Sequence, residues 1–169
     1  MKFKYCPICG QQLEEKYSYD DGGVPFCPKD DIMYFDTPRP CIIVAVMREN
    51  MILMLKQSYT FKNSNVLVSG YVNTGEAIEK TVLREVKEET GIIVKQPKYL
   101  GSYYLDSKEI IMLTFMAQYE AGDIIQSEEV DWAGWVCIEN ALSEMPEDKI
   151  GRSVVRKVIE ELSKKTGLK

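Results

Sequence analysis

Three glutamates lie within five positions of the segment "LREVKEETG", residues 83–91: Glu85, Glu88 and Glu89. On a helix, spacings of three and four residues bring side chains next to one another. Two like charges about 4 Å apart repel by about 4 kcal/mol at an effective dielectric constant of 20, and a divalent cation reverses that sign. Carboxylate oxygens are the ligands that Mg²⁺ and Mn²⁺ prefer, and these ions also bind phosphate groups. The cluster is therefore either a solvated helix face or a metal site.

The segment 76–90 has the pattern of a helix that would present these carboxylates. Thr74 is a suitable N-cap and Gly91 a suitable C-terminal stop. At about 100° per residue, the glutamates occupy one sector of this helix and the apolar residues occupy the next. The apolar residues that we expect to face the core are Val82, Leu83 and Val86. The carboxylates should then lie at the edge of the buried stripe, not in the middle of the solvated face.

A wider window favours the metal site. The stretch "GYVNTGEAIEKTVLREVKEETGI", residues 70–92, resembles the signature of the Nudix hydrolases at every defined position. That signature is a glycine, five residues, a glutamate, seven residues, Arg-Glu, an aliphatic residue, any residue, Glu-Glu, any residue, a glycine and an aliphatic residue. The resemblance covers roughly residues 38–169. It implies a strand, a loop and a helix that hold divalent metal ions against a diphosphate.

The resemblance also implies roles for single residues. Glu85 and Glu89 correspond to the main ligands of Mg²⁺ or Mn²⁺, and Glu88 to a further ligand or a water-activating base. The backbone carbonyl of Ser69, just before the signature glycine, is expected to bind metal as well. Arg84 is expected to orient the glutamates through an ion pair and not to touch the substrate.

The reaction that the resemblance implies is hydrolysis. Water attacks the bridging diphosphate of a nucleoside diphosphate derivative, and two phosphate-bearing products leave. Phosphoryl transfer needs neutralised phosphate oxygens and a positioned water, and a carboxylate-held metal site supplies both. The chain contains no histidine, which excludes His-based triads and zinc catalysis through histidine ligands.

A later pair of carboxylates, Glu128 and Glu129, stands in the stretch "SEEVDWAGWV" before an expected strand. The Nudix pyrophosphatases that act on NADH carry a glutamate six residues before an aromatic residue in the strand after the signature. In those enzymes it is a metal ligand or a base. Counting back from Trp135 gives Glu129, which we prefer to Glu128 for this role. The alternative is a charged turn without a function.

Residues 1–36 contain three cysteines, many turn residues and no long apolar run, so they need a staple in place of a core. "CPIC" is a zinc knuckle, and "CPKD" has the form of a second knuckle whose last cysteine is replaced. Zinc accepts three thiolates and one carboxylate in a tetrahedral site. The predicted ligands of one structural Zn²⁺ are Cys6, Cys9, Cys27 and Asp30. A degenerate ribbon without metal is the alternative.

The stiff segment "TPRP" then separates a zinc-ribbon-like domain, residues 1–36, from a Nudix domain, residues 37–169. A ribbon before a Nudix domain resembles the NADH pyrophosphatase branch, whose members are homodimers. That branch has the motif Ser-Gln-Pro-Trp-Pro-Phe-Pro after the signature. The stretch "SYYLDSKEIIML", from Ser102, keeps the serine but not the tryptophan or the prolines. Tyr71, next to the signature glycine, is a candidate to stack on a base or a nicotinamide ring.

The remaining pattern predicts an α+β fold, an α/β/α sandwich with a mixed sheet. Strands are expected at 41–47, 51–57, 65–72, 97–105, 109–120 and 130–138, and a closing amphipathic helix at 152–165. Of the 169 residues, 45% are hydrophobic and 28% charged, as in a globular protein. No apolar run reaches 18 residues and no signal-peptide core is present, so we expect a cytoplasmic protein without a membrane span.

The formal net charge of −5 argues against non-specific binding to nucleic acid. The resemblance to the Nudix family and its NADH pyrophosphatase branch implies a pyrophosphohydrolase that depends on Mg²⁺ or Mn²⁺, with a dinucleotide such as NADH or NAD⁺ as the expected substrate, cleaved to NMN(H) and AMP. One alternative is a non-catalytic Nudix module that senses a nucleotide or binds nucleic acid. Another is a house-cleaning pyrophosphatase for nucleoside triphosphates.

Overall fold

The apolar run "CIIVAVM" forms the centre of the larger part of the protein. In the computed structural model, which describes residues 3–166, this run belongs to strand β4 (Arg39–Arg48). A tight turn leads into β5 (Met51–Lys56), and Met47 pairs with Ile52 in the predicted hairpin. Neighbouring residues of a strand point to opposite faces. Because both faces of β4 are buried, its pattern is a continuous apolar run and not an alternating one.

The sheet built around β4 is mixed, as predicted. Its strand order is β7-β8-β4-β5-β9, with β6 paired to β4 beside β5. Strands β4 and β8 are parallel, and the other neighbours are antiparallel. The other strands of this sheet are β6 (Val68–Tyr71), β7 (Ile93–Leu105), β8 (Ile110–Ala121) and β9 (Trp132–Cys137). A 3-10 turn, η1 (Asp106–Lys108), joins β7 to β8.

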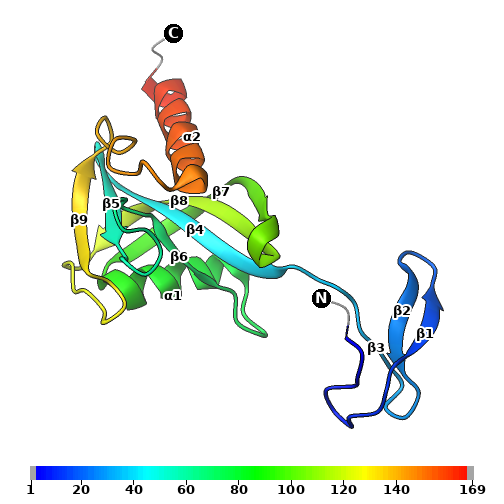
Figure 1. Ribbon diagram of the computed structural model, residues 1–169. Coiled ribbons are helices and arrows are strands. Elements are labelled where there is room, and N and C mark those ends of the chain that lie inside the picture. The colour runs from blue at the N-terminus through cyan, green and yellow to red at the C-terminus, as the bar shows by residue number, and fades with distance from the viewer. Residues whose placement is uncertain (1–2, 167–169) are drawn as a thin grey trace. The chain divides into compact units, whose positions relative to one another are not determined.

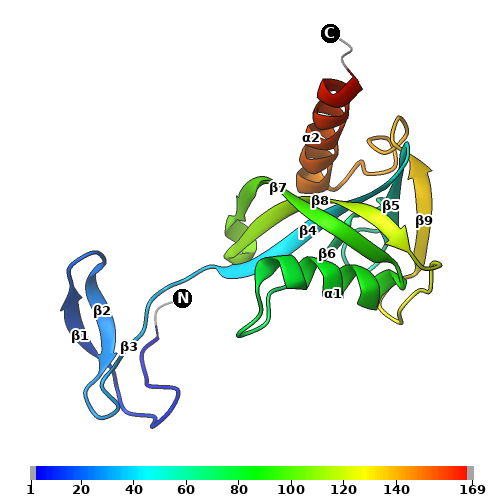
Figure 2. The same cartoon turned by 180° about the vertical axis from the view of Figure 1, so that it is seen from behind.

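Two helices cover the two faces of the sheet, α1 (Ile78–Thr90) and α2 (Lys149–Thr166). Val82 and Val86 of α1 pack with one set of β4 side chains, and Val154 of α2 packs with the alternate set. Figures 1 and 2 show the helices on opposite sides of the sheet. The predicted α/β/α sandwich is therefore confirmed. Among the described residues, no helix is long and apolar enough to cross a membrane.

The signature helix differs from its prediction at its first turn. Helix α1 begins at Ile78 and not at residue 76, and Ala77 occupies the N-cap position without a side-chain cap. Thr74 is therefore not the N-cap. At the other end the prediction is confirmed, because Gly91 is left-handed (φ 72°) and its N–H donates to the carbonyl of Lys87. The expected core position of Leu83 is wrong, since its side chain is 40% exposed.

One edge of β4 is shared by two strands. Residues 41–44 of β4 pair with β6, whereas residues 47–48 pair with β5. The chain between β5 and β6 leaves this edge as a loop, and a bridge between Leu55 and Val66 closes the loop. The sheet therefore divides on this side of β4 into β5 and β6, and we call this division the split edge. Helix α1, β6 and the end of β5 meet there.

The N-terminal part of the chain forms a second compact unit, Met1–Pro38, distinct from Arg39–Lys169. It holds a three-stranded antiparallel sheet of β1 (Glu14–Ser18), β2 (Gly22–Cys27) and β3 (Ile32–Met33). Among residues 3–38, the buried apolar residues are Cys6, Val24 and Cys27. This unit therefore has almost no hydrophobic core of its own.

Candidate active site

The carboxylate of Glu85 lies directly over the backbone of β6. A Cβ atom added at Gly70 would overlap the carboxyl group of Glu85. Only glycine leaves that space open, which explains why a glycine stands at this position of the strand. The preceding residue, Ser69, pairs with Ile43 of β4 and is held in the sheet beside Glu85. Strand β6 and helix α1 thus meet where the carboxylate of Glu85 covers the backbone of Gly70.

Arg84 ties the acidic residues around it into a network. Its guanidinium binds both carboxylate oxygens of Glu76, each at 2.9 Å. It also donates to Glu85 at 2.7 Å, to Glu88 at 2.9 Å and to the carbonyl of Tyr71 at 3.1 Å. The bidentate contact lowers the pKa of Glu76 to about 2. All the donor groups of Arg84 are engaged within the protein, so it orients its neighbours.

Glu89 is the most unusual carboxylate of the protein. Its side chain is only 6% exposed, although no lysine or arginine among the described residues forms an ion pair with it. Gln57, at the end of β5, donates to Oε1 at 3.4 Å, whereas Oε2 is buried without a hydrogen-bond partner. An unpaired charge in such surroundings is costly. The site therefore lacks a cationic partner for Glu89.

The pKa values of Glu89, which is buried, and of Glu85, which is half-buried, are both raised. Burial, followed by the charge of Glu85, raises the pKa of Glu89 to about 8. Burial also raises the pKa of Glu85, and the contact with Arg84 opposes that shift. Both carboxyl groups are therefore held in an environment that disfavours their charged form.

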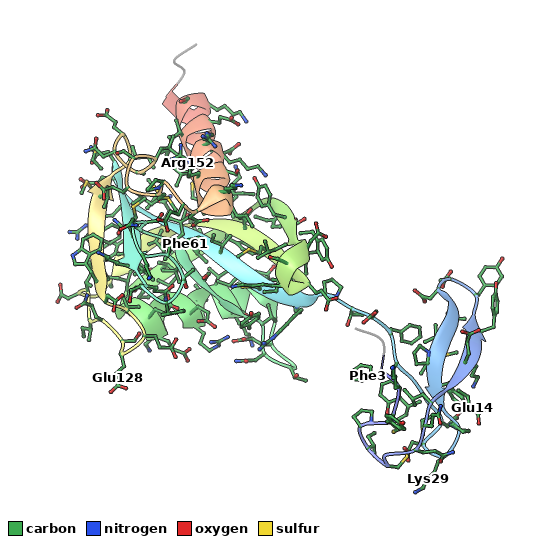
Figure 3. All side chains as sticks on the ribbon, viewed as in Figure 1. Phe3, Glu14, Lys29, Phe61, Glu128 and Arg152 are labelled. Carbon is green, nitrogen blue, oxygen red and sulfur yellow. The ribbon has the colours of Figure 1, made fainter. Side chains whose placement is uncertain are left out.

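A third carboxylate, Glu129, is brought to Glu89 by the loop between β8 and β9. A hydrogen bond attaches this loop to the C-terminal end of α1, where the N–H of Ser127 donates to the carbonyl of Glu89. It ends on β5, where the N–H of Asp131 donates to the carbonyl of Lys56. Glu129 is close enough to raise the pKa of Glu89. Glu128, labelled in Figure 3, extends outward into solvent.

These groups open into a cavity of about 660 Å³. Glu85, Glu89 and Glu129 line its acidic end, and Ser69 and Tyr71 line the wall that β6 supplies. The structure thus brings together five residues that the sequence singled out. Because the three carboxylates face one open space, a bound ion there would meet both protein and substrate.

Glu88 and Arg84 do not line this cavity. The side chain of Glu88 is 60% exposed, and its carboxylate is turned toward Arg84. The roles predicted for Glu88, as a further ligand or as a base, remain predictions.

Sequence reasoning did not find several residues of the cavity wall. Gln57 and Tyr59 come from the loop after β5, Arg39 is the first residue of β4, and Lys108 is the last residue of η1. None belongs to the signature or to a local motif. The one sequence signal is that Gln57 is a polar residue directly after an apolar strand.

The acidic end fits a divalent cation by the chemistry of its donors. It offers the carboxylate oxygens of three glutamates, one of these oxygens is buried without a partner, and Ser69 of β6 lines the same cavity. Hard divalent cations such as Mg²⁺ bind through one or two such carboxylates and the phosphates of a substrate.

The N-terminal unit brings its four predicted ligands together. The donor atoms of Cys6, Cys9, Cys27 and Asp30 all lie within 4.8 Å of one another. The sulfurs of Cys9 and Cys27 are 3.6 Å apart, and Asp30 Oδ2 lies 3.1 Å and 3.2 Å from the sulfurs of Cys6 and Cys27. In a tetrahedral zinc site, two thiolate sulfurs are about 3.8 Å apart. The hydroxyl of Tyr34 also lies 3.1 Å from the sulfur of Cys6.

A mixed sheet between two helices, with a strand, a loop and a helix that carry a group of carboxylates, makes up the larger unit of the chain. The family model of the NUDIX domain matches residues 37–161. The chain therefore belongs to the Nudix family.

Two similar proteins refine this assignment. The chain is 33% identical over 159 residues to the NAD-capped RNA hydrolase NudC of Shigella dysenteriae serotype 1, covering 94% of this chain and 59% of that protein. It is 31% identical over 157 residues to the protein of the same name from Escherichia coli O9:H4, covering 92% and 60%. The chain thus spans about three fifths of the length of these curated relatives.

Solved structures share the fold. A NUDIX hydrolase from Nitrosomonas europaea matches with a TM-score of 0.77 and 18% identity, over 94% of this chain and 92% of that one. The NUDIX domain of Shewanella oneidensis NrtR, crystallised with ADP ribose, matches with a TM-score of 0.65 and 18% identity, over 81% and 94%. At these identities the likeness concerns the fold alone.

Proposed function

We propose that the chain is a pyrophosphohydrolase that depends on Mg²⁺ or Mn²⁺ and cleaves the diphosphate of a dinucleotide such as NADH or NAD⁺, giving NMN(H) and AMP. The observation that carries the proposal is Glu89. A buried carboxylate with an unpaired oxygen and a raised pKa is aimed at a cavity that two further carboxylates line. The names of the curated relatives, which refer to NAD-capped RNA, support the same class of substrate.

In this proposal Glu85, Glu89 and the carbonyl of Ser69 hold the metal, with Glu129 at the mouth of the cavity as a further ligand or base. When bound there, such an ion would supply positive charge against the phosphates and lower the pKa of a coordinated water. Arg84 keeps Glu85 in place, and Gln57 orients Glu89 through its amide. Tyr71 offers a ring against which a base or a nicotinamide stacks. No side chain of the protein has to become covalently bound to the substrate.

The test is a turnover screen with Mg²⁺ and with Mn²⁺. The substrates are NADH, NAD⁺, ADP-ribose, a diadenosine polyphosphate, nucleoside triphosphates and a short RNA with an NAD cap, and the products are separated by chromatography. NMN(H) and AMP from the dinucleotides are the expected products. Cleavage of nucleoside triphosphates alone would favour the alternative of a house-cleaning nucleoside triphosphate pyrophosphatase. Binding without turnover of any substrate would favour a sensor.

We also propose that the cysteine cluster holds one structural Zn²⁺ and that the protein is a homodimer. The donor set of three sulfurs and one oxygen supports zinc. The resemblance to the NADH pyrophosphatase branch supports the dimer. Metal analysis of freshly purified protein and light scattering test the two statements separately.

A further inference from the structure

The cavity is lined by three cations that the proposed reaction does not use, Arg39, Lys108 and Lys149, and the first two come from neighbouring segments of the chain. Arg39 is the first residue of β4, and Lys108 ends the 3-10 turn before β8. The two segments are adjacent, because the N–H of Arg39 donates to the carbonyl of Glu109 at 3.0 Å. Both side chains therefore belong to one corner of the cavity wall.

The guanidinium of Arg39 is already oriented. Its central carbon lies 3.5 Å from the centroid of the Tyr71 ring, which is the geometry of a cation–π contact. Within residues 3–166, neither Arg39 nor Lys108 forms an ion pair. Arg84, by contrast, is saturated by three carboxylates. Stacking fixes the plane of Arg39 and leaves its N–H donors available.

This corner is set apart from the acidic end. Ile43 of β4 pairs with Ser69, and Arg39 stands four residues earlier on the same strand. At about 3.3 Å per residue, its backbone lies about 13 Å along the strand from the Ser69 pair. A diphosphate held at Glu85 and Glu89 would leave Arg39 and Lys108 to meet another part of the substrate.

We propose that Arg39 and Lys108 bind a phosphate that the substrate carries outside the scissile diphosphate, on the ribose of the nucleotide half next to Tyr71. This inference rests on the proposed function and names a substrate class within it. A guanidinium binds phosphate through two parallel N–H bonds, and an ammonium adds a point charge. The phosphate has two sources, a 2′-phosphate on a free dinucleotide or the 3′-phosphodiester of an RNA with a dinucleotide cap.

The decisive comparison uses substrates that differ by this one group. NADPH carries a 2′-phosphate that NADH lacks, and NAD joined through its 3′-oxygen to one further nucleotide represents the capped RNA. The specificity constant kcat/KM is measured with each substrate for the full-length wild type, Arg39→Met and Lys108→Met. Lys80→Met, which removes an exposed cation of α1 outside the cavity, is the matched control for net charge.

We expect the wild type to prefer at least one phosphate-bearing substrate over its unphosphorylated counterpart by about tenfold, which corresponds to about 1.4 kcal/mol. Arg39→Met and Lys108→Met should each reduce this preference, and Lys80→Met should retain it. Arg39→Lys should keep part of it, because the charge remains but the stacked plane is lost. A preference for NADPH over NADH identifies the 2′-phosphate as the bound group, and a preference for NAD joined to a further nucleotide identifies the 3′-phosphodiester.

Two results would overturn the inference. One is a wild type without any preference. The other is an equal loss for all substrates in Arg39→Met, since that pattern belongs to a contact with the scissile diphosphate. Equilibrium binding, measured by calorimetry with Ca²⁺ in place of Mg²⁺, separates this inference from the proposed function. Phosphate-dependent binding without hydrolysis would sustain the inference and remove the function, whereas hydrolysis without phosphate preference would do the reverse.

Discussion

The two clusters of candidate metal ligands stand in opposite surroundings. The carboxylates of α1 border a hydrophobic core that packs against one face of a six-stranded sheet. The cysteine cluster belongs to a unit with three buried apolar residues among residues 3–38, two of them cysteines of the cluster itself. The first cluster stands on a folded hydrophobic core, whereas the second has almost no core around it. Under the proposal above, the first would use its ion for chemistry and the second for structure.

The largest expected effect follows from removing zinc. A zinc-selective chelator should unfold residues 3–38 and leave the Nudix domain folded, because structural zinc supplies about 10–16 kcal/mol in small metal-dependent domains. Both tryptophans, Trp132 and Trp135, lie in the Nudix domain, so their fluorescence reports that domain alone. Amide NMR signals report the N-terminal unit. Cys27→Ser should act like the chelator, and Cys137→Ser, outside the cluster, should not.

The second effect concerns Glu89. In the proposed site Glu89 is the charge partner of a metal ion. Removing one partner of a buried charge pair costs about 3–5 kcal/mol, so Glu89→Gln should lower turnover by about 1,000-fold. The fold should remain intact, because glutamine keeps the shape of the side chain and its contact with Gln57. Steady-state kinetics and circular dichroism test the two halves of this statement. Unchanged turnover would remove Glu89 from the site.

The same substitution should change the pH dependence of stability without metal. The folded-state pKa of Glu89, about 8, lies above its ordinary value of 4.5. The folded state therefore keeps a proton that the unfolded state releases, and stability falls as the pH rises from 4.5 to 8, by at most about 5 kcal/mol. Glu89→Gln should remove this fall, so urea unfolding at pH 8 should show a variant more stable than the wild type. If Glu89→Gln is less stable than the wild type at pH 8, the claim that the buried charge of Glu89 destabilises the metal-free fold is contradicted.

A third effect tests how β6 positions the metal ligands. Gly70→Ala places a methyl group where the carboxyl group of Glu85 lies, so it should displace that ligand. We expect a 10- to 100-fold loss of activity, the range for misplaced metal ligands, with weaker binding of Mn²⁺ measured by calorimetry. Gly75→Ala is the comparison variant for backbone strain, because its added methyl group meets no atom within 4 Å but stands on a left-handed backbone (φ 79°). Equal losses in the two variants would point to general strain.

The smallest effect distinguishes two neighbouring carboxylates. Glu129→Gln should lower kcat by about tenfold, since an exposed ligand is partly replaced by water. Glu128→Gln should have almost no effect, because its side chain points away from the cavity. Steady-state kinetics of the two variants under identical conditions provide the test. The reverse ranking would mean that the count from Trp135 selected the wrong residue.

The sequence predicted the regular parts of the fold because their signals are local. The apolar run of β4, the hairpin after it and the stop at Gly91 each depend on a few neighbouring residues. The start of α1 was misplaced by two residues for a physical reason. Glu76 is not a helical residue, since its carboxylate binds the N–H of Asn73 and the guanidinium of Arg84.

The candidate site was predictable only where its residues follow one another in the chain. Glu85 and Glu89 were predicted from the match to the Nudix signature, whose defined positions lie close together in the chain; their helical spacing alone fitted a solvated face equally well. Gln57, Arg39 and Lys108 reach the cavity through strand pairing and loop closure, which no local pattern records. The position of Glu129 depends on hydrogen bonds that fasten its loop to α1 and to β5.

The parallel pairing of β4 with β8 has a consequence for how the site comes into being. It joins Arg39 to Ile110, so about seventy residues form a closed loop before this contact exists, and such distant pairings form slowly. Strand β6 and helix α1, which carry Ser69 and Glu89, lie inside that loop. During synthesis, a chain that has emerged only as far as Ile92 has every signature residue but lacks β8, the parallel partner of β4. The metal site should therefore mature late, after β8 has joined the sheet.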